Sequence, residues 1–199
     1  MKVFRGKCVN RVDDFMKEEQ AGLIADCING DETAIARLIE KYQPGVFRLT
    51  LSILNDPGDA SEATQDTFIA MLKALNSYHE KSTFKAWLYR IALNISRSRL
   101  RKRNALERLR QTLTSIFEVQ FQHSPTPEDA VIDGEEGAAI WRALDKLGEK
   151  HRIPIVLRYY HDLSVIEIAE IMSIKEGTVH SRLSIGREKL RVQLEDAGE

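Results

Sequence analysis

The stretch Ser164–Leu194, SVIEIAEIMSIKEGTVHSRLSIGREKLRVQL, predicts two helices with a short turn between them. Ser164 followed three residues later by Glu167 forms a capping box, which predicts the start of the first helix. The apolar period then breaks up to Gly177, which suits a tight turn or a backbone with positive φ. Thr178 is expected to cap the second helix.

These two helices form a predicted helix-turn-helix. Ala169 is small enough to let the second helix cross closely over the first, and Val179 and Leu183 are expected to anchor that second helix in the core. The side chains that point elsewhere near its N-terminus are short and polar or basic, which suits a DNA major groove. An αα-hairpin with a solvated basic face is the alternative.

Length and composition place the chain among ordinary globular proteins. Its 199 residues suggest one or two domains, with 43% hydrophobic and 30% charged residues. No apolar run approaches 18 residues, so no membrane insertion is expected. The N-terminus lacks the apolar core of a secretory signal, so a cytoplasmic protein is expected.

Charge is segregated along the chain although the formal net charge is only −1. Seven basic residues and one acid lie between residues 97 and 110, whereas residues 111–141 contain six acids and no Lys or Arg. This separation suggests different partners for different segments.

The sequence contains no pattern of residues typical of a catalytic or metal site. Cys8 and Cys27 lie 19 residues apart without a CxxC or a nearby His pair, and Cys27 falls on an apolar helical face. Phosphate-binding, hydrolase and metalloprotease motifs are missing from the sequence. We therefore expect no enzyme activity, no metal, no cofactor and no small-molecule substrate.

The N-terminal half predicts a series of helices after a weakly specified extension, residues 1–19. Asp31 is expected to cap a helix that Pro44 breaks or that restarts there. Asp56 followed by Pro57 predicts the start of another helix, which continues to Leu75. Its polar side carries several acids, which either stabilise the helix dipole or form a docking face for a partner.

The next predicted helix runs from Phe84 to about Arg103, with Ser82 or Thr83 as its cap. Aromatic, Arg and Asn side chains alternate on it, beside a polar loop at residues 76–81. Such a combination holds single-stranded bases, which stack on rings while cations contact phosphates. The alternative is that Trp87 and Tyr89 belong to the core and the Arg residues form a solvated face.

Residues 104–135 lose the apolar period and contain the segment HSPTP, which predicts an acidic, flexible linker that is partly helical at its start. A second small helical domain follows over residues 136–199, where Pro154 fits only near the first turn of its helix. The predicted fold is therefore all-α, with two small helical domains and a helix-turn-helix in the second.

Three segments in this order closely resemble the extracytoplasmic-function (ECF) sigma factors of the bacterial sigma-70 family: DPGDASEATQDTFIAMLKAL, STFKAWLYRIALNISRSRLRKR and LDKLGEKHRIPIVLRYYHDLSVIEIAEIMSIKEGTVHSRLSIGREKL. The resemblance covers about residues 20–103 and 136–194. It implies a protein that binds core RNA polymerase, recognises the −10 and −35 promoter elements and promotes transcription initiation. An anti-sigma factor is an expected partner.

The resemblance also assigns roles to segments. It implies that residues 20–103 form the region 2 domain and residues 136–199 the region 4 domain. Many members of the family carry Gly where Ser173 stands, and Lys or Arg where His180 stands. The acid-rich linker at 104–135 would occupy the RNA path of the polymerase.

The residues implied by the resemblance form three sets. The polymerase-binding set is Asp59, Glu62, Gln65 and Asp66; the −10 set is Ser77, Tyr78, His79, Trp87, Arg90, Asn94 and Arg97; and the −35 set is Thr178, His180, Ser181, Arg182, Ser184 and Arg187.

Two other classes of protein remain as alternatives. One is a stand-alone transcriptional regulator, which would bind a palindromic operator as a dimer. The other is a helical adaptor that binds only protein. The aromatic and basic helix at 84–103 argues against the regulator, because a sensor domain does not need a platform for single-stranded DNA.

Overall fold

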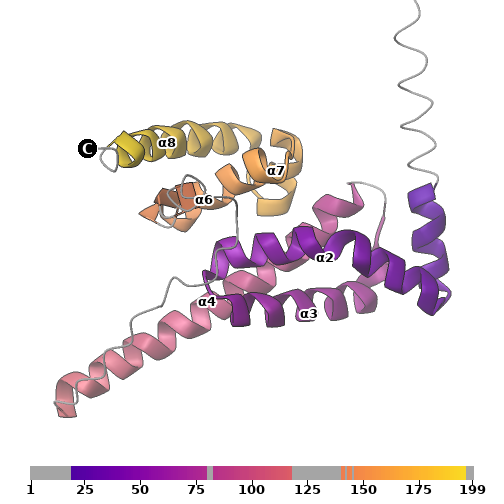
Figure 1. The fold of residues 1–199 in the computed structure, drawn as a ribbon, viewed down its shortest axis with the longest axis horizontal. Coiled ribbons are helices and arrows are strands. Elements are labelled where there is room, and N and C mark those ends of the chain that lie inside the picture. The colour runs from indigo at the N-terminus through magenta and orange to yellow at the C-terminus, as the bar shows by residue number, and fades with distance from the viewer. Residues whose placement is uncertain (1–18, 80–82, 118–139, 142, 145, 196–199) are drawn as a thin grey trace, which may run out of the picture.

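The computed structural model describes residues 19–79, 83–117, 140–141, 143–144 and 146–195. Side chains are described within these ranges except at residues 108–117 and 195. Every regular element in the described residues is a helix, which confirms the predicted all-α class (Figure 1).

The N-terminal body is a bundle of three long helices, preceded by a short helix over residues 19–28. The long helices are α2 (Glu32–Leu54), α3 (Pro57–Ala74) and α4 (Phe84–Phe117), and each packs against the other two. A 3₁₀ turn, Leu75–Ser77, follows α3. Leu38, Leu49, Met71, Leu88 and Leu93 lie fully buried between the helices, as expected from the apolar stripe of each.

The predicted caps at the starts of these helices are confirmed. The side-chain oxygens of Asp31, Asp56 and Thr83 each accept a hydrogen bond from a backbone N–H in the following first turn, at 2.8, 2.7 and 3.2 Å. Pro57 occupies the first helical position after Asp56. Local side-chain chemistry therefore fixes where each helix begins.

The predicted break at Pro44 is wrong, because α2 continues through it for 23 residues. Pro44 is exposed, as is Glu40, so water can reach the Glu40 carbonyl that loses its helical partner. Gly45 follows on the inner side, where an added Cβ would overlap the Tyr89 hydroxyl of α4. The proline therefore faces solvent and the glycine allows close packing.

Helix α4 is longer than predicted, because it continues past Arg103 to Phe117. The first part of the expected linker is thus a continuation of the same helix, in line with the expected helical start. The rest of that linker, residues 118–135, and most of the N-terminal extension, residues 1–18, lie outside the described residues.

The C-terminal body contains the helical residues 140–141, 143–144 and 146, then α6 (Glu149–Ile155), α7 (Val165–Met172) and α8 (Glu176–Glu195). A π-helical segment, Val156–Tyr160, continues directly from α6. Pro154 is the sixth residue of α6, so the expectation that it would lie near the first turn is wrong.

Helices α7 and α8 form the predicted helix-turn-helix. The capping box is confirmed, with Glu167 N donating to Ser164 Oγ at 3.2 Å and Ser164 N donating to Glu167 Oε2 at 2.9 Å. The turn differs from the prediction. Ser173 adopts the left-handed conformation, with φ 54° and ψ 47°, and Gly177 lies inside α8 without a positive φ. Because α8 begins at Glu176, Thr178 lies in its first turn and does not cap it.

The two bodies pack directly against each other. Helix α4 contacts α7, and α2 contacts α6. In Figure 1 the C-terminal body lies on one side of α2 and α4, while α3 lies on the opposite side. The outer face of α3 therefore points away from the C-terminal body.

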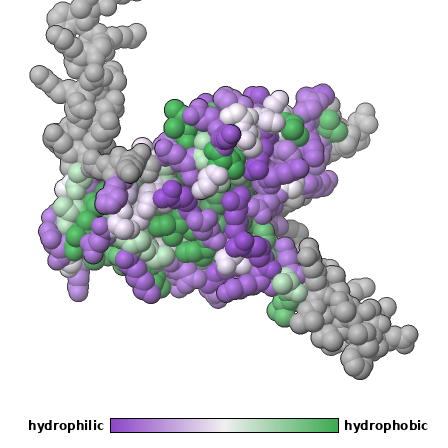
Figure 2. Space-filling model, turned by 180° about the vertical axis from the view of Figure 1, so that it is seen from behind, coloured by the Kyte–Doolittle hydropathy of each residue, from purple (hydrophilic) through white to green (hydrophobic). Residues whose placement is uncertain are grey.

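The surface is mainly hydrophilic, with hydrophobic side chains in small patches on the face shown in Figure 2. Within the described ranges, no helix combines the length and the apolarity needed to cross a bilayer.

Candidate nucleic-acid interface

The packing face of α8 agrees with the sequence pattern. Val179 and Leu183 are buried, with 0% and 6% of their surface exposed. Gly186 continues this face, whereas Ile185 is exposed. A Cβ on Gly186 would lie 2.7 Å from Ile155 Cδ1, so the glycine sets how closely α8 crosses α6.

The predicted DNA-contacting side chains lie on the outer side of α8. His180, Ser181, Ser184 and Arg187 are exposed. Their spacing along the helix allows them to reach one groove of DNA together. The remaining two members of the set, Thr178 and Arg182, are half-buried at the edge of this surface. The structure therefore brings the whole −35 set onto one helix.

Two further contacts hold this surface in place. The Arg182 carbonyl lies 3.3 Å from His151 Nδ1, which ties the middle of α8 to α6. Arg187 Nη1 donates to Tyr159 Oη at 3.4 Å, and Tyr159 is 59% exposed. Sequence analysis missed Tyr159, because the π-helical segment that places it beside α8 leaves no periodic signal in the sequence.

The −10 set divides into exposed and buried members. Ser77, His79, Arg90 and Asn94 are exposed, on the 3₁₀ turn, the start of the following loop and α4. Trp87 has only 9% of its surface exposed. The loop residues 80–82 lie outside the described residues.

Trp87 belongs to an aromatic cluster in the core. Its ring centroid lies 5.2 Å from that of Tyr78 and 5.5 Å from that of Phe84. Tyr89 is also buried, and burial raises its pKa to about 12. The alternative that Trp87 and Tyr89 are core residues is confirmed. Trp87 packs against the half-buried Tyr78 from the core side. Because it is buried, Trp87 offers little ring surface on which a base could stack.

Arg97 is the member of the −10 set that already has an ionic partner. Its Nε lies 2.6 Å from Glu149 Oε1 at the start of α6, in the other body. Both side chains are partly exposed, at 27% and 37%. Contact between Arg97 and a phosphate would therefore have to replace this ion pair.

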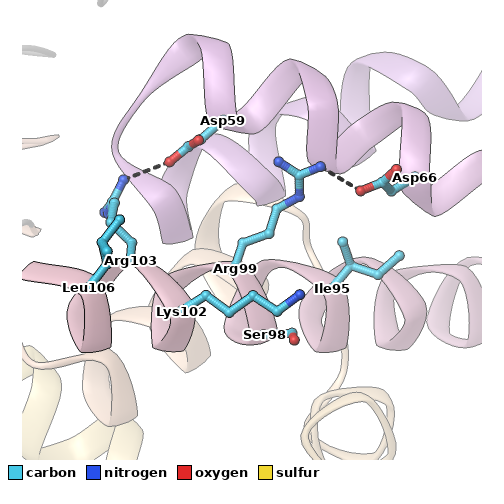
Figure 3. A pocket seen from close by; sticks show the side chains of 8 residues that line it. All are labelled: Asp59, Asp66, Ile95, Ser98, Arg99, Lys102, Arg103 and Leu106. Carbon is cyan, nitrogen blue, oxygen red and sulfur yellow. Dashed lines mark hydrogen bonds and ion pairs between the residues drawn. The ribbon is translucent and has the colours of Figure 1, made fainter.

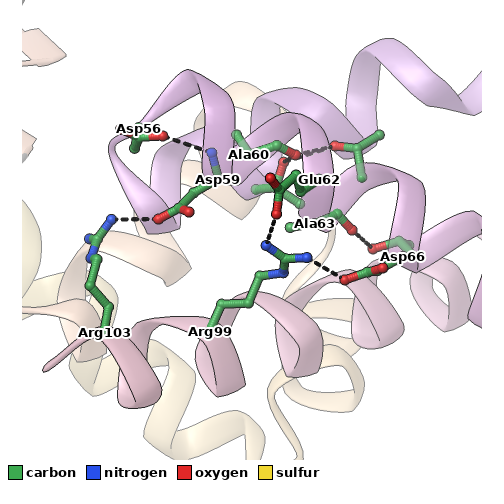
Figure 4. A network of polar contacts seen from close by, with 11 residues as sticks. Asp56, Asp59, Ala60, Glu62, Ala63, Asp66, Arg99 and Arg103 are labelled. Atoms are coloured by element: carbon green, nitrogen blue, oxygen red, sulfur yellow. Dashed lines mark hydrogen bonds and ion pairs between the residues drawn. The ribbon is translucent and has the colours of Figure 1, made fainter. Parts of the chain in front are cut away.

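The acids of the polymerase-binding set lie on α3, where α4 supplies their counter-charges (Figure 4). Arg99 bridges Glu62 and Asp66 at 2.8 and 2.5 Å, and Arg103 contacts Asp59 at 2.9 Å. The hydrogen bonds that Arg99 donates to Glu62 and Asp66 raise the pKa of Arg99. The carboxylates are thus oriented by α4 while Glu62 and Asp66 stay exposed to solvent.

A groove of about 580 Å³ lies beside these ion pairs, between α3 and α4 (Figure 3). Ile95 and Leu106 supply apolar walls, and Lys102 adds an ammonium group. Leu106 is 67% exposed. Apolar wall next to fixed charge is typical of a protein-binding surface rather than of an enclosed small-molecule site.

Sequence analysis missed four residues of this face. Arg99 and Arg103 were expected only as part of a basic run, because contact between α3 and α4 is not visible in either segment alone. Ile69 is 51% exposed and Leu72 is 37% exposed. Gln65, Ile69 and Leu72 follow one another at helical spacing on the same side of α3. Ile69 and Leu72 therefore extend its exposed face.

Within the described part of the chain, no group of three or more His, Cys, Asp or Glu side chains is placed to hold a metal ion. Cys27 is buried, and burial raises the pKa of its thiol, which keeps it in the less reactive protonated form.

Comparison with known proteins identifies two matching family models. The Sigma-70 region 2 model matches residues 38–106, and the Sigma-70 region 4 model matches residues 137–190. The chain is 34% identical to the ECF RNA polymerase sigma factor SigW of Bacillus subtilis over 172 residues, which cover 84% of this chain and 92% of that protein. It is 32% identical to the ECF RNA polymerase sigma-E factor of Escherichia coli K12, covering 81% and 86% of the two chains.

Solved structures agree. The structure of CnrH in complex with the cytosolic domain of CnrY matches with a TM-score of 0.64 and 25% identity, covering 87% of this chain and 96% of that one. The sigma factor RpoE in complex with the anti-sigma factor NepR from Bartonella quintana has the same fold, with a TM-score of 0.64, 22% identity and coverage of 80% and 96%. The chain described here therefore belongs to the extracytoplasmic-function sigma factors of the sigma-70 family, which are transcription initiation factors.

Proposed function

We propose that the two bodies divide the work of promoter recognition. Residues 20–103 dock on core RNA polymerase through α3 and engage the −10 element through α4 and the preceding turn. Residues 136–199 engage the −35 element through α8. The match of region 2 and region 4 models to these two parts supports this layout.

The outer side of α8 is the observation that carries the proposal. Val179 and Leu183 hold one side in the core, which turns His180, Ser184 and Arg187 toward solvent. In a helix-turn-helix, the N-terminal residues of the second helix contact base edges. Arg182 lies at the edge of this surface and can form a bidentate pair with guanine.

The −10 element is engaged by the exposed side of α4. Arg90 and Asn94 lie one turn apart and are both exposed, beside Ser77 and His79 of the preceding turn. An amide at Asn94 can hydrogen-bond the edge of an unstacked base, while cations hold phosphates. Tyr78 is the accessible ring of this surface, and Trp87 fixes its position from the core.

Polymerase docking uses the exposed face of α3. Glu62, Gln65 and Asp66 present polar groups, and Ile69 adds apolar area on the same side. Arg99 restricts the two carboxylates, so less side-chain entropy is lost when they bind a partner. Residues 104–135 would enter the RNA path of the polymerase, because their acids resemble an RNA backbone in charge.

The same proposal covers partners and location. We infer that an anti-sigma factor binds this chain, a proposal that accords with the protein partner of the matching CnrH structure. The protein would act in the cytoplasm, without catalysis, cofactor or small-molecule substrate. Residues 1–19 receive no role.

Promoter-specific run-off transcription tests the proposal. The chain is added to core polymerase, and DNA binding by the chain alone is measured in parallel. A sigma factor gives a promoter-specific transcript only with core polymerase. A stand-alone regulator would bind DNA by itself without changing the transcript, and an adaptor would do neither.

A further inference from the structure

His161, the residue that follows the π-helical segment, makes several of the contacts between the two bodies. Its carbonyl accepts a hydrogen bond from Lys85 Nζ of α4 at 2.8 Å, and its Nδ1 lies 3.3 Å from Tyr89 Oη of α4. Its ring meets Tyr89 and Tyr160 edge-on, with centroid distances of 5.1 and 5.3 Å. Both the backbone and the imidazole of His161 thus join the C-terminal body to α4.

Further polar contacts join the two bodies. Thr83 Oγ1 donates to Glu167 Oε1 at 3.0 Å, and Arg152 Nη2 donates to the Ile53 carbonyl at the end of α2 at 3.1 Å. The Arg97–Glu149 ion pair is another contact between the two bodies. These side-chain hydrogen bonds and the ion pair add to an apolar contact, because buried hydrophobic side chains of both bodies belong to one cluster.

The surroundings of His161 do not suit a charged imidazole. It is 7% exposed, and in the described residues its Nε2 is buried without a hydrogen-bond partner. Lys85 approaches from α4, and Arg48 of α2 lies over the neighbouring Tyr160 ring with its Cζ 5.6 Å from the centroid. Burial, together with these two cations, lowers the pKa of His161 to about 4.

Glu167 on α7, a carboxylate that interacts with Lys85, is already engaged. Glu167 accepts hydrogen bonds from Ser164 and Thr83. Burial works against its charged form, but these hydrogen bonds together with Lys85 lower the pKa of Glu167. Glu167 therefore stays ionised near Lys85. The Tyr89 hydroxyl can accept from Nδ1 of His161, but within the described residues a second proton, on the buried Nε2, finds no acceptor.

We propose that the two bodies form a closed state of the free protein in which neutral His161 is the latch, and that a proton on His161 releases it. Opening would separate the two bodies along the apolar cluster that they share, while the helices of each body and their caps are kept. The imidazole would leave its site between Tyr89 and Tyr160 and become hydrated.

The closed state bears on promoter recognition, a consequence that rests on the function proposed above. The position numbers of the −10 and −35 elements place them about 25 base pairs apart. At 3.4 Å per base pair this is about 85 Å along B-DNA. In the closed state α4 touches α7, so the two bodies lie side by side and not about 85 Å apart. Arg97 is also paired with Glu149 in this state. The α3 face lies on the other side (Figure 1), so the closed protein can still dock through its acids.

The direction of the pH effect follows from the two forms of His161. In the open chain its pKa returns toward 6.5, and in the closed chain it is about 4. Closure is therefore fully favoured above pH 6.5 and is lost progressively as the pH falls toward 4. Linkage gives about a tenfold fall in the closed-to-open ratio at pH 5.5.

Single-molecule energy transfer between the bodies measures closure directly. Dyes are attached to Lys73→Cys on α3 and Lys189→Cys on α8, both exposed positions, in a Cys8→Ser background. Cys27 is buried and should not label. The full-length chain is measured from pH 7.5 to 4.5, with helix content followed by circular dichroism at each pH.

We expect the wild type to open as the pH falls while its helix content stays constant. His161→Phe keeps a ring in the site without a titrating group and should stay closed throughout. His161→Lys places a fixed charge there and should be open at pH 7.5. His180→Phe is the matched control, because His180 is exposed on α8 and its loss should leave the wild-type pH response unchanged.

Three results would overturn the latch: a wild-type distance that does not change between pH 7.5 and 4.5, a His161→Phe variant that opens like the wild type, or loss of helix at the pH of opening. Run-off transcription at pH 7.5 with core polymerase is the separate arm. A wild-type chain that produces no promoter-specific transcript contradicts the proposed function, whatever the distances show.

Discussion

Two substitutions, one in the turn between α7 and α8 and one in the first turn of α8, test the local geometry through the sign of their effects. Ser173 has φ 54° and ψ 47°, the left-handed region in which the Cβ of an L-residue crowds its own backbone. Gly177 lies in the first turns of α8 without a positive φ, and an added Cβ there meets nothing within 4 Å. The structure therefore predicts that Ser173→Gly and Gly177→Ala both stabilise the protein.

The magnitudes follow from backbone energetics. A left-handed conformation costs an L-residue about 1–2 kcal/mol, which glycine avoids. Glycine also increases the entropy of the unfolded chain, which offsets about 0.4–1 kcal/mol of that gain. Ser173→Gly should therefore add about 0.5–1 kcal/mol, or about 1–4 °C in Tm for a chain of this size. Gly177→Ala should add about 0.5–1 kcal/mol, the usual difference between these residues inside a helix.

Urea unfolding followed by circular dichroism at 222 nm measures both effects. The midpoint should rise in each variant while the dependence on urea stays unchanged, since neither substitution alters the surface exposed on unfolding. Ser173→Ala is the control, because it keeps the Cβ and should gain little. If the tight turn were at Gly177 and not at Ser173, both main substitutions would lower the midpoint, and the described turn would be refuted.

Three further substitutions test the proposed contacts and the packing of α8. Arg182→Ala should weaken use of the −35 element by about 1–3 kcal/mol, measured by competition between promoters with and without that element, and an unchanged preference would refute its role. Asn94→Ala should slow promoter opening, followed by permanganate reactivity of unpaired thymines, with core-polymerase affinity retained; loss of that affinity instead would show that Asn94 acts elsewhere. Gly186→Ala places a Cβ against Ile155 and should destabilise the C-terminal body by about 1–3 kcal/mol in thermal unfolding, and wild-type stability would contradict the close crossing.

The features that sequence predicts well are those decided within one or two turns. Asp31, Asp56 and Ser164 cap helices because their side chains reach backbone N–H groups two or three residues away. The apolar stripes of α2 and α8 likewise depend only on spacing. The resemblance to ECF sigma factors, which matches segments in order along the chain, adds the family. The functional surfaces that it implies stay a proposal.

The errors arise where the environment decides. Pro44 stays inside α2 because its side faces solvent, and Gly177 stays helical because Ser173 makes the turn first. Leu72 fits the apolar period of α3 yet lies at the edge of its stripe, with 37% of its surface exposed. None of these outcomes can be derived from the local sequence pattern.

The contact between the two bodies could not be predicted from sequence at all. Lys85 and His161 are 76 residues apart, in two separate segments of the chain, and no local spacing indicates that they meet. The ion pairs of Arg99 with α3 are similar, because they depend on how two helices cross. Long-range polar contacts of this kind leave no periodicity in the sequence and are visible only once the helices are placed.

Mapping the 5′ ends of transcripts tests the central claim most directly. Core polymerase transcribes a library of random promoters with and without the chain. We predict a new set of start sites in the presence of the chain, each preceded by two sequence blocks at a fixed spacing, and we expect the start sites to be lost when that spacing changes by about half a helical turn, or 5 base pairs. Identical start sites with and without the chain would contradict the account.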